Sequence, residues 1–544
     1  MYTRRSGLIQ KKMIMNKPIV VIQVLAFLLN FYDTGHSQTI LIQGNQSGLL
    51  DADTVMIAGN VTVPAGEQLK FKAGTMVLAT GHFRLDVNGS ISAIGEPGSP
   101  VVFSVADTAG FSNYATGRGG WDGFHFNGND PLSDSSVFKY CRFEYGKAVG
   151  DSLGKMGGIF NIRDFGRISV SNCTFINNYA YHWGGAIFTE SGDIRISCST
   201  FQGNVCGQSA PPYGYGGAVC FRYSRPEIFG CEFTGNTSTG IGGAISLEYT
   251  DALVSNNRFL DNFSGLGGAL GYLRSAPARI VEGNLFVNNS CLFFGGAIAF
   301  IKACPLVLHN TITDNHSSSY GGAVYCNDSA APVVVNTIIH GNQAGEGAQL
   351  YIWDILSAPE FYHCNIQGGK EAFGGTGGIG FHSVYSNNID TLPAFLNNGP
   401  HPYSLQSNSP CINKGMFDPG WMFYPDKDLS GNPRIDGMLP DIGAYEYQND
   451  LGSDFHIVSA DIKVSPNPFS DLLCIDLGKT YTEPVSLNIF DGRGIRVHSA
   501  MIDPGIQSYT WNCNIHNNGV LSKGIFIIKL ISPDFQAARV VILK

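Results

Sequence analysis

A pair of adjacent glycines occurs seven times, at a nearly constant interval, in the middle of this 544-residue chain. The pairs, 25 to 32 residues apart, are Gly157-Gly158, Gly184-Gly185, Gly216-Gly217, Gly242-Gly243, Gly267-Gly268, Gly295-Gly296 and Gly321-Gly322. All but the first continue with Ala and then Ile, Val or Leu. A fixed period in this range is typical of stacked supersecondary units, so the chain is expected to form a solenoid.

A second motif, an apolar residue followed three positions later by Asn, repeats out of phase with the glycines. Its copies are Phe175/Asn178, Phe201/Asn204, Phe233/Asn236, Phe259/Asn262, Phe286/Asn289 and Ile312/Asn315. A small residue lies two places before each apolar marker. From this offset we predict that Asn257, Asn284, Asn310 and Asn336 form one inward stack, like the Asn ladders of stacked sheets. Cys141 and Cys173 occupy the same column, where they act as small buried hydrophobes or, alternatively, form a disulfide.

The stretches between the motifs are short and rich in β-branched residues, with no helical period. Several strands per copy predict an all-β coil of parallel strands, one copy per turn, with turns stacked at about 4.8 Å. Glycine would serve where the backbone needs positive φ or approaches a neighbour without a Cβ in the way.

The combination of Phe175 to Asn178 with Gly184 to Ile187 resembles the repeats of chlamydial polymorphic outer-membrane proteins. It is also similar to repeats in secreted β-helix proteins of Bacteroidota. The resemblance covers roughly residues 140–370 and implies a right-handed parallel β-helix, a pectate-lyase-like solenoid. This fold carries adhesins, lyases and hydrolases alike, so it does not by itself assign a function.

The rest of the chain divides into segments of different composition. Lys11, Lys12 and Lys17 precede an apolar run at 19–31 that is too short to span a bilayer, which is typical of a secretory signal. The expected segments are a signal peptide at 1–37, N-terminal β-helix turns at 38–139, repeats at 140–389, a terminal segment at 390–448, a linker at 449–460 and a C-terminal domain at 461–544. The terminal segment is expected to cover the open edge of the stack.

The last 80 or so residues alternate strands at the spacing of a small Ig-like β-sandwich. Pro466 to Phe469, Asp491-Gly492, Gly524 to Leu530 and Lys544 occur in the order that resembles the type A C-terminal sorting domain of the type IX secretion system of Bacteroidota. The resemblance implies the type IX secretion machinery as a partner. It also implies removal of this domain and an extracellular or cell-surface location.

Charge and composition exclude some partners and leave one metal alternative. The net charge of −9 comes without a basic block, which argues against nucleic acid. Asp426, Asp428 and Ser430 have the spacing of a calcium loop, but position twelve is Gly437 rather than Glu, so a structural turn is the favoured interpretation. We therefore expect no cofactor, with calcium as the alternative.

Charged residues recur six places after the first glycine of successive pairs: Arg163, Glu190, Arg222 and Glu248. Glu190 and Glu248 would lie two turns apart, about 10 Å at Cα, which is marginally compatible with the roughly 6.5–9.5 Å of an inverting glycosidase pair. Arg222 between them favours the charged form of both, which is poor for a general acid. A ladder of ion pairs is the favoured interpretation.

Aromatic residues in the longer loops are the candidate binding residues. Tyr179, Tyr181 and His182 precede one glycine pair, and Tyr213 lies in the longest insertion, residues 206–217. Insertions in a repeat stack gather on one face, and exposed Tyr rings suit sugars or proteins. An adhesin-like protein that binds polysaccharide or a host or cell-surface partner is the leading hypothesis. The alternative is a polysaccharide lyase or glycoside hydrolase, which requires a compact group of acids that the sequence does not show.

Overall fold

The computed structural model describes residues 38–128, 135–150, 155–208, 213–275, 280–416, 427–436, 439–448, 462–491, 496–513, 524–532 and 535–543. The predicted signal peptide at 1–37 and the linker at 449–460 lie outside these residues, and their boundaries stay predictions. The described part is almost entirely β-structure; its helices are the short η1 (Lys370–Ala372) and α1 (Gly375–Ile379).

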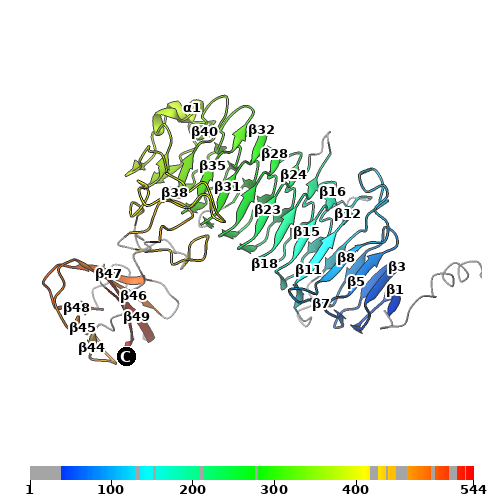
Figure 1. Cartoon of the computed structure of the whole chain (residues 1–544), viewed down its shortest axis with the longest axis horizontal. Coiled ribbons are helices and arrows are strands. Elements are labelled where there is room, and N and C mark those ends of the chain that lie inside the picture. The colour runs from blue at the N-terminus through cyan, green and yellow to red at the C-terminus, as the bar shows by residue number, and fades with distance from the viewer. Residues whose placement is uncertain are drawn as a thin grey trace, which may run out of the picture.

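Each regular turn of the solenoid holds four short parallel strands. One turn consists of β14 (Ile168–Ser171), β15 (Thr174–Ile176), β16 (Tyr179–Ala180) and β17 (Ile187–Glu190). Every strand pairs in parallel with its equivalent one turn later, so that Phe175 lies opposite Phe201. Figure 1 shows the resulting stack of arrows along the length of the molecule. One sequence repeat is therefore one turn, and the predicted all-β parallel fold is confirmed.

The strands align in four columns. The Phe–Asn column contains β8 (Val101–Val105), β11 (Cys141–Glu144), β15, β19 (Thr200–Gln202), β23 (Glu232–Thr234), β27 (Arg258–Leu260), β31 (Leu285–Val287), β35 (Thr311–Thr313), β39 (Ile338–His340) and β42 (Asn365–Ile366). The Gly–Gly column contains β9 (Phe124–Asn127), β13 (Phe160–Arg163), β17, β21 (Val219–Arg222), β25 (Ile245–Glu248), β29 (Leu270–Leu273), β33 (Ile298–Ile301), β37 (Val324–Asn327) and β40 (Leu350–Ile352).

The third column forms a separate sheet: β2 (Gly48–Leu50), β4 (Gln68–Phe71), β7 (Ser90–Ile94), β10 (Ser136–Lys139), β14, β18 (Ile194–Ser197), β22 (Glu227–Phe229), β26 (Leu253–Ser255), β30 (Ile280–Glu282), β34 (Leu306–Leu308), β38 (Val333–Val335), β41 (Glu360–Tyr362) and β43 (Tyr385–Ser386). The fourth contains β12 (Lys147–Ala148), β16, β20 (Val205–Cys206), β24 (Thr237–Ser238), β28 (Phe263–Leu266), β32 (Ser290–Phe294) and β36 (His316–Ser317). The first turns add β1 (Thr39–Asn45), β3 (Thr54–Val63), β5 (Met76–Ala79) and β6 (Leu85–Val87). The long β3 pairs with both β5 and β6 and so joins the first two columns.

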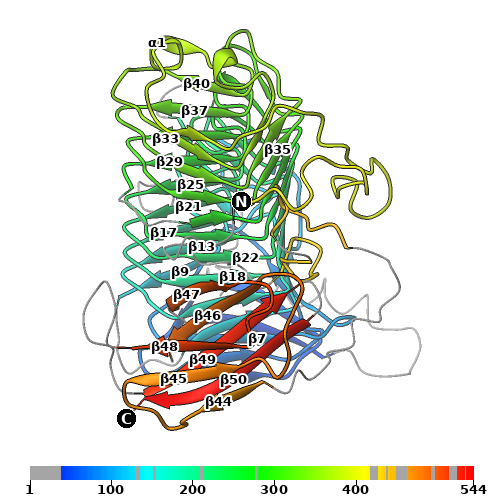
Figure 2. The same cartoon turned by 90° about the vertical axis from the view of Figure 1, so that its left-hand side faces the viewer.

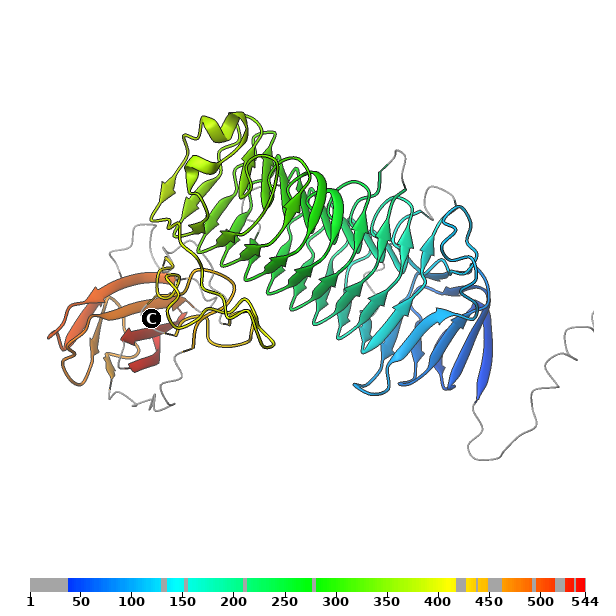
Figure 3. The same cartoon turned by 45° about the horizontal axis from the view of Figure 1, so that its top comes forward.

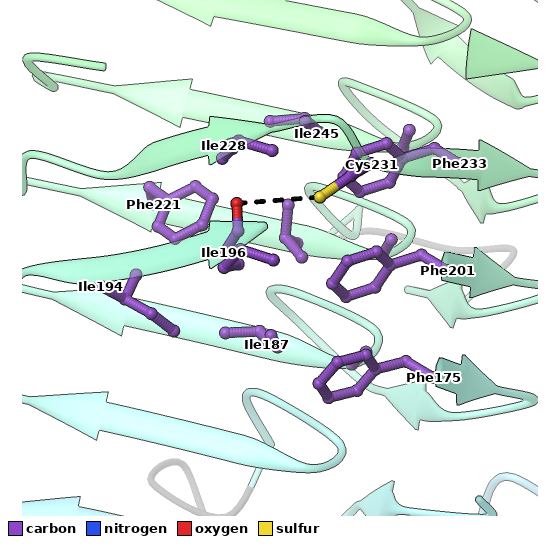
Figure 4. Packing of buried hydrophobic residues seen from close by; sticks show 14 of the residues in the cluster. Phe175, Ile187, Ile194, Ile196, Phe201, Phe221, Ile228, Cys231, Phe233 and Ile245 are labelled. Atoms are coloured by element: carbon purple, nitrogen blue, oxygen red, sulfur yellow. Dashed lines mark hydrogen bonds between the residues drawn. The ribbon is translucent and has the colours of Figure 1, made fainter. Parts of the chain in front are cut away.

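The core is a stack of rings along the solenoid axis. The marker Phe residues are fully buried, and the rings of Phe175 and Phe201 lie parallel with centroids 4.6 Å apart. Figure 4 shows Phe175, Phe201 and Phe233 one above another, with Ile187 and Ile194 opposite them. Such ring pairs contribute about 0.5–1.5 kcal/mol each beyond their burial. The repeated Phe residues therefore form a continuous stack of rings in the interior of the solenoid.

The Asn of each Phe-x-x-Asn motif belongs to a continuous ladder. Asn204 Nδ2 donates to Asn236 Oδ1 at 2.9 Å, and Asn236 Nδ2 donates to Asn262 Oδ1 at 3.0 Å. Each Oδ1 also accepts the backbone N–H of the Asn one turn earlier, as Asn236 Oδ1 does from Asn204 at 3.1 Å. The residue before each ladder position turns the corner with positive φ, 56° at Asp261. The motif thus supplies an aromatic ring for the core, a residue that turns the corner and a buried amide that is hydrogen-bonded.

The second, predicted Asn stack has three of its four proposed members. Asn257 Nδ2 donates to Asn284 Oδ1, and Asn284 Nδ2 donates to Asn310 Oδ1, both at 3.0 Å. The assignment of Asn336 is wrong, because Asn310 N donates to Thr337 Oγ1 instead. Strand pairing sets Ile339 opposite Ile312, so the marker of that turn is Ile339 and its partner column position is Thr337. Asn336 is the corner residue, with φ 49°, and its Nδ2 donates to the carbonyl of Met416.

Cysteines in the same column are buried free thiols. Cys141 N donates to Cys173 Sγ at 3.4 Å, and the Cys141 thiol donates to the Ala93 carbonyl. The disulfide alternative for this pair is therefore wrong. The two thiols act as the small hydrogen-bonded residues that this ladder position requires.

The glycine pair is required by two different contacts. Gly184 has φ +63°, a conformation that glycine adopts without steric cost. A Cβ on Gly185 would lie 2.0 Å from the carbonyl oxygen of Gly217 in the next turn, so no side chain fits there. The same close approach recurs along the column, and for this reason the two glycines repeat together.

The terminal segment does more than cover the open edge of the last turn. The described residues between 390 and 448 fold back along the flank of the Phe–Asn column, as the yellow trace in Figure 3 shows. Ala444 N donates to Thr311 Oγ1 at 3.0 Å, and Arg258 contacts His401 Nδ1 at 2.8 Å. The expectation of a simple end cap is therefore corrected: this segment also buries the outward apolar residues of several earlier turns.

The C-terminal sandwich has its own core. One sheet contains β44 (Lys463–Ser465), β45 (Leu472–Asp476) and β48 (Ser508–Asn512), and the other contains β46 (Val485–Asp491), β47 (Arg496–Ile502), β49 (Gly524–Ser532) and β50 (Phe535–Leu543). All pairs within them are antiparallel. Trp511, Phe469 and Phe526 pack between the sheets, which are orange to red in Figure 2.

Candidate binding face of the solenoid

The outward side chains of the Gly–Gly column form a continuous surface, which we call the outer strip. Residues alternate along a strand, so the fourth residue of each strand points outward. These residues are Arg163, Glu190, Arg222, Glu248, Leu273, Ile301 and Asn327, followed by Trp353 at the equivalent place after β40. Figure 2 shows the strands that carry them, from β9 to β40, one above another. The strip is charged in its first half and apolar in its second.

The charged half is a ladder of ion pairs. Glu190 lies between Arg163, at 2.7 Å, and Arg222, at 3.2 Å. Glu248 lies between Arg222, at 2.9 Å, and Arg274, also at 2.9 Å. Both candidate catalytic carboxylates therefore share one guanidinium and each has a second. Each carboxylate is held between two guanidinium groups, so the geometry supports an ion-pair ladder over an acid and base pair.

Beside the second half of the strip lies a group of aromatic rings, which we call the aromatic cluster: Phe293, Phe294, Tyr320, Tyr325 and Tyr351, together with Trp353 of the strip. The ring of Phe294 lies 5.7 Å from that of Tyr320, 4.7 Å from that of Tyr325 and 5.6 Å from that of Trp353. Phe293 is 50% exposed and Trp353 is 46% exposed. Large exposed apolar patches mark binding sites on soluble proteins.

Trp353 and its aromatic neighbours are not among the binding residues predicted from the sequence. Phe294 and Tyr320 are half-buried and support the two exposed rings beside them. The register of the repeat could have identified Trp353, because Trp353 occupies the same column position as Arg222 and Glu248.

Two further exposed rings lie beside the charged half. Tyr223 and Tyr249 follow Arg222 and Glu248 at corners with φ 47° and 51°. Their rings are parallel, with centroids 5.0 Å apart, and both are about half exposed. The Arg274 guanidinium lies 5.8 Å from the Tyr249 ring. The sequence analysis did not predict this pair, although each Tyr directly follows a charged residue of the predicted ladder.

The predicted loop residues have different environments. Tyr179 is wrong as an exposed binding residue: it is in β16, 1% exposed, and its ring stacks on Tyr114 at 3.8 Å. Burial raises the pKa of its hydroxyl. Tyr181 and His182 are half-buried and in ring contact at 4.8 Å. Burial, together with the nearby Lys155, lowers the pKa of His182. Tyr213 is 48% exposed.

The possible calcium loop is a hydrogen-bonded turn where it is described. Asp426 lies outside the described residues. Asp428 is buried, and its Oδ1 accepts the backbone N–H groups of Ser430 at 3.0 Å and Asn432 at 2.8 Å. Its Oδ2 accepts the N–H of Glu446 at 2.9 Å. Both oxygens thus face N–H donors, and within the described ranges no three His, Cys, Asp or Glu residues group as metal ligands.

Comparison with known families agrees with this architecture. Residues 157–329 match the family model described as right handed beta helix region, and residues 463–544 match the secretion system C-terminal sorting domain. The chain joins a right-handed β-helix to a sorting domain. No curated protein matches the chain. The sorting domain implies handling by the type IX secretion system and a secreted or cell-surface protein. In the described part of the chain, no helix has the length and hydrophobicity to cross a membrane.

Proposed function

We propose that this is an adhesin-like surface or secreted protein that binds a neutral polysaccharide through the aromatic cluster. The observation that carries the proposal is the pair of half-exposed rings, Phe293 and Trp353, supported by four more rings beneath and beside them. Aromatic faces offer flat apolar area to a sugar, and Tyr320, Tyr325 and Tyr351 add hydroxyl groups.

The shape of the surface favours a chain-like ligand. Equivalent positions in successive turns repeat at about 4.8 Å, so neighbouring rings can contact successive units of a polymer. No member of the aromatic cluster carries a charge, which favours a neutral glycan over an acidic one. Export by the sorting domain brings this face to where such polymers occur.

A binding experiment with a matched control tests the proposal. A glycan array identifies the ligand, and titration then compares wild type with Trp353→Ala and Phe229→Ala. Phe229 is 46% exposed but belongs to β22, in a different column. We expect roughly tenfold weaker binding for Trp353→Ala, as for a central aromatic anchor, and none of this loss for Phe229→Ala.

A reducing-end assay on the same glycan separates binding from catalysis. If the protein cleaves the glycan and Glu190→Gln or Glu248→Gln abolishes the cleavage, the adhesin-like function is refuted in favour of a hydrolase or lyase. Equal binding by Trp353→Ala and wild type would remove the aromatic cluster as the site.

A further inference from the structure

A cavity of about 420 Å³ lies near the N-terminal end of the solenoid, far along the chain from the aromatic cluster. One wall is the connection after β5, residues 79–82, and the other is the loop after β8, residues 106–120, which we call the anchored loop. The volume is within the usual range for small-molecule sites.

The anchored loop is held by a buried lysine. Lys147 is fully buried, and its Nζ donates to the carbonyls of Gly110 at 3.1 Å, Asn113 at 2.9 Å and Arg118 at 2.9 Å. Tyr114 of the same loop stacks on Tyr179 in β16. Burying an ammonium group is unfavourable unless it is hydrogen-bonded, so a loop organised around one is rigid. The buried Tyr179 is part of this support.

The opposite wall is fixed to the same lysine. His82 Nε2 lies 2.8 Å from the carbonyl oxygen of Lys147. A carbonyl only accepts, so Nε2 carries the hydrogen, and Nδ1 has no hydrogen-bond partner among the described residues. A Cβ on Gly117 would lie 2.4 Å from His82 Cγ, so only glycine permits the loop to approach this ring. Both walls are therefore positioned before any ligand arrives.

The polar side chains that line the cavity keep hydrogen-bonding capacity for a ligand. Asp107 uses one oxygen to accept the N–H of Ala109 at 2.8 Å. Arg118, which lines the same cavity, forms no ion pair with Asp107 or with any other described acid. The Thr80 hydroxyl donates to Ile57 O and so has only acceptor capacity left. The cavity combines an Arg donor with Asp and Thr acceptors, beside the free ring nitrogen of His82.

This combination selects a chemical class. A phosphate or sulfate would face the Asp107 carboxylate, and a simple cation would face the Arg118 guanidinium. A hydroxyl group both donates and accepts, so a ring bearing several hydroxyl groups can satisfy all four side chains. We propose that this cavity is a second binding site, for a neutral mono- or disaccharide, separate from the aromatic cluster and independent of it.

The His82 ring serves as a reporter inside the site. The full-length protein, labelled with ¹³C-histidine, is titrated separately with methyl α-D-glucopyranoside, N-acetylglucosamine, maltose and cellobiose, and with inorganic phosphate as the anionic probe. His82→Gln assigns the His82 signals. We expect at least one sugar to shift these signals to saturation and phosphate to leave them unchanged.

Variants then locate the contact. Arg118→Ala and Asp107→Ala should each weaken the sugar titration tenfold or more, whereas Arg84→Ala should not, because Arg84 pairs with Asp86 outside the cavity lining. Trp353→Ala should also leave the titration unchanged. The proposal is overturned if none of the four sugars shifts His82, if phosphate saturates the site instead, or if Arg118→Ala and Asp107→Ala bind as wild type does.

Discussion

At the scale of single residues, the solenoid depends on side chains that repeat one contact in every turn. Asn236 is an example: its Oδ1 accepts from Asn204, its Nδ2 donates to Asn262 Oδ1, and the same Nδ2 donates to the Phe201 carbonyl at 2.9 Å. Its side chain is completely buried. Because no water reaches these groups, each hydrogen bond is required rather than optional.

Asn236→Leu should therefore destabilise the β-helix by about 1–3 kcal/mol for each polar group left without a partner. Gln202→Leu is the control, because Gln202 is exposed on β19 and a surface change usually stays within about 0.5 kcal/mol. The measurement is the free energy of unfolding from urea denaturation. Equal stability of the two variants would contradict a structural role for the ladder.

At the scale of elements, the terminal segment is organised around a buried charged group. Arg434 is 2% exposed, and its NH2 lies 3.4 Å from Glu446 Oε2 and donates to the Gly443 carbonyl. Burial raises the pKa of Glu446 and of Asp441, despite the attraction of Arg434. In the solenoid beside them, burial raises the pKa of Glu282 from 4.5 to about 7.

These shifts set the direction of a pH dependence. A carboxyl with a raised folded-state pKa binds its proton more tightly in the native state, so it disfavours folding as pH rises from the unfolded to the folded value. For Glu282 this window is pH 4.5 to about 7, and the loss is about 3 kcal/mol at most. His309 acts in the opposite direction. Burial lowers its pKa, so the protein loses stability as the pH falls below 6.5.

The variant Glu282→Gln separates the contribution of the Glu282 carboxyl to the pH dependence from that of His309. We expect the variant to gain stability relative to wild type between pH 5 and pH 8, because the amide cannot ionise. The stability of Glu282→Gln minus that of wild type, measured by denaturation at both pH values, should be larger at pH 8. A difference that does not change with pH would show that Glu282 does not titrate in this window.

At the scale of the whole molecule, the solenoid and the sandwich have separate cores. The main apolar core of the solenoid extends from Ile42 to Phe373, and the core of the sandwich lies between Ile462 and Leu543. Separate cores are the mark of domains that fold independently. Removal of the sorting domain is therefore expected to leave the solenoid folded.

Deletion of residues 464–544 should leave a folded, soluble β-helix that stays in the periplasm. The full-length chain should reach the cell surface or the medium, shortened at its C-terminus, because the signal peptide predicted at 1–37 would direct transfer across the inner membrane only. Cell fractionation of both forms is the measurement, with circular dichroism of the truncated protein as the folding control. Efficient surface display of the truncated form would show that the sandwich is not the sorting signal.

The sequence by itself determined what repeats. The period of Phe175 and Asn178, the glycine pair at Gly184, and the outward column of Glu190 and Arg222 follow from contacts between equivalent positions, which one residue type satisfies in every turn. The register of the turn that contains Asn336 could not be predicted from the sequence. Asn336 and Thr337 are both small and polar, and only the pairing of Ile339 with Ile312 shows which of them is in the ladder.

The tertiary structure decided what does not repeat. Tyr179 is buried because the anchored loop, more than sixty residues earlier, places Tyr114 over it. Lys147 anchors the loop that lines the cavity only because three carbonyls of that loop converge on its Nζ. Trp353 belongs to the aromatic cluster because rings from two earlier turns and from its own turn gather there. Such contacts join residues with no common spacing, so no periodicity reports them, and they exist only once the turns are stacked.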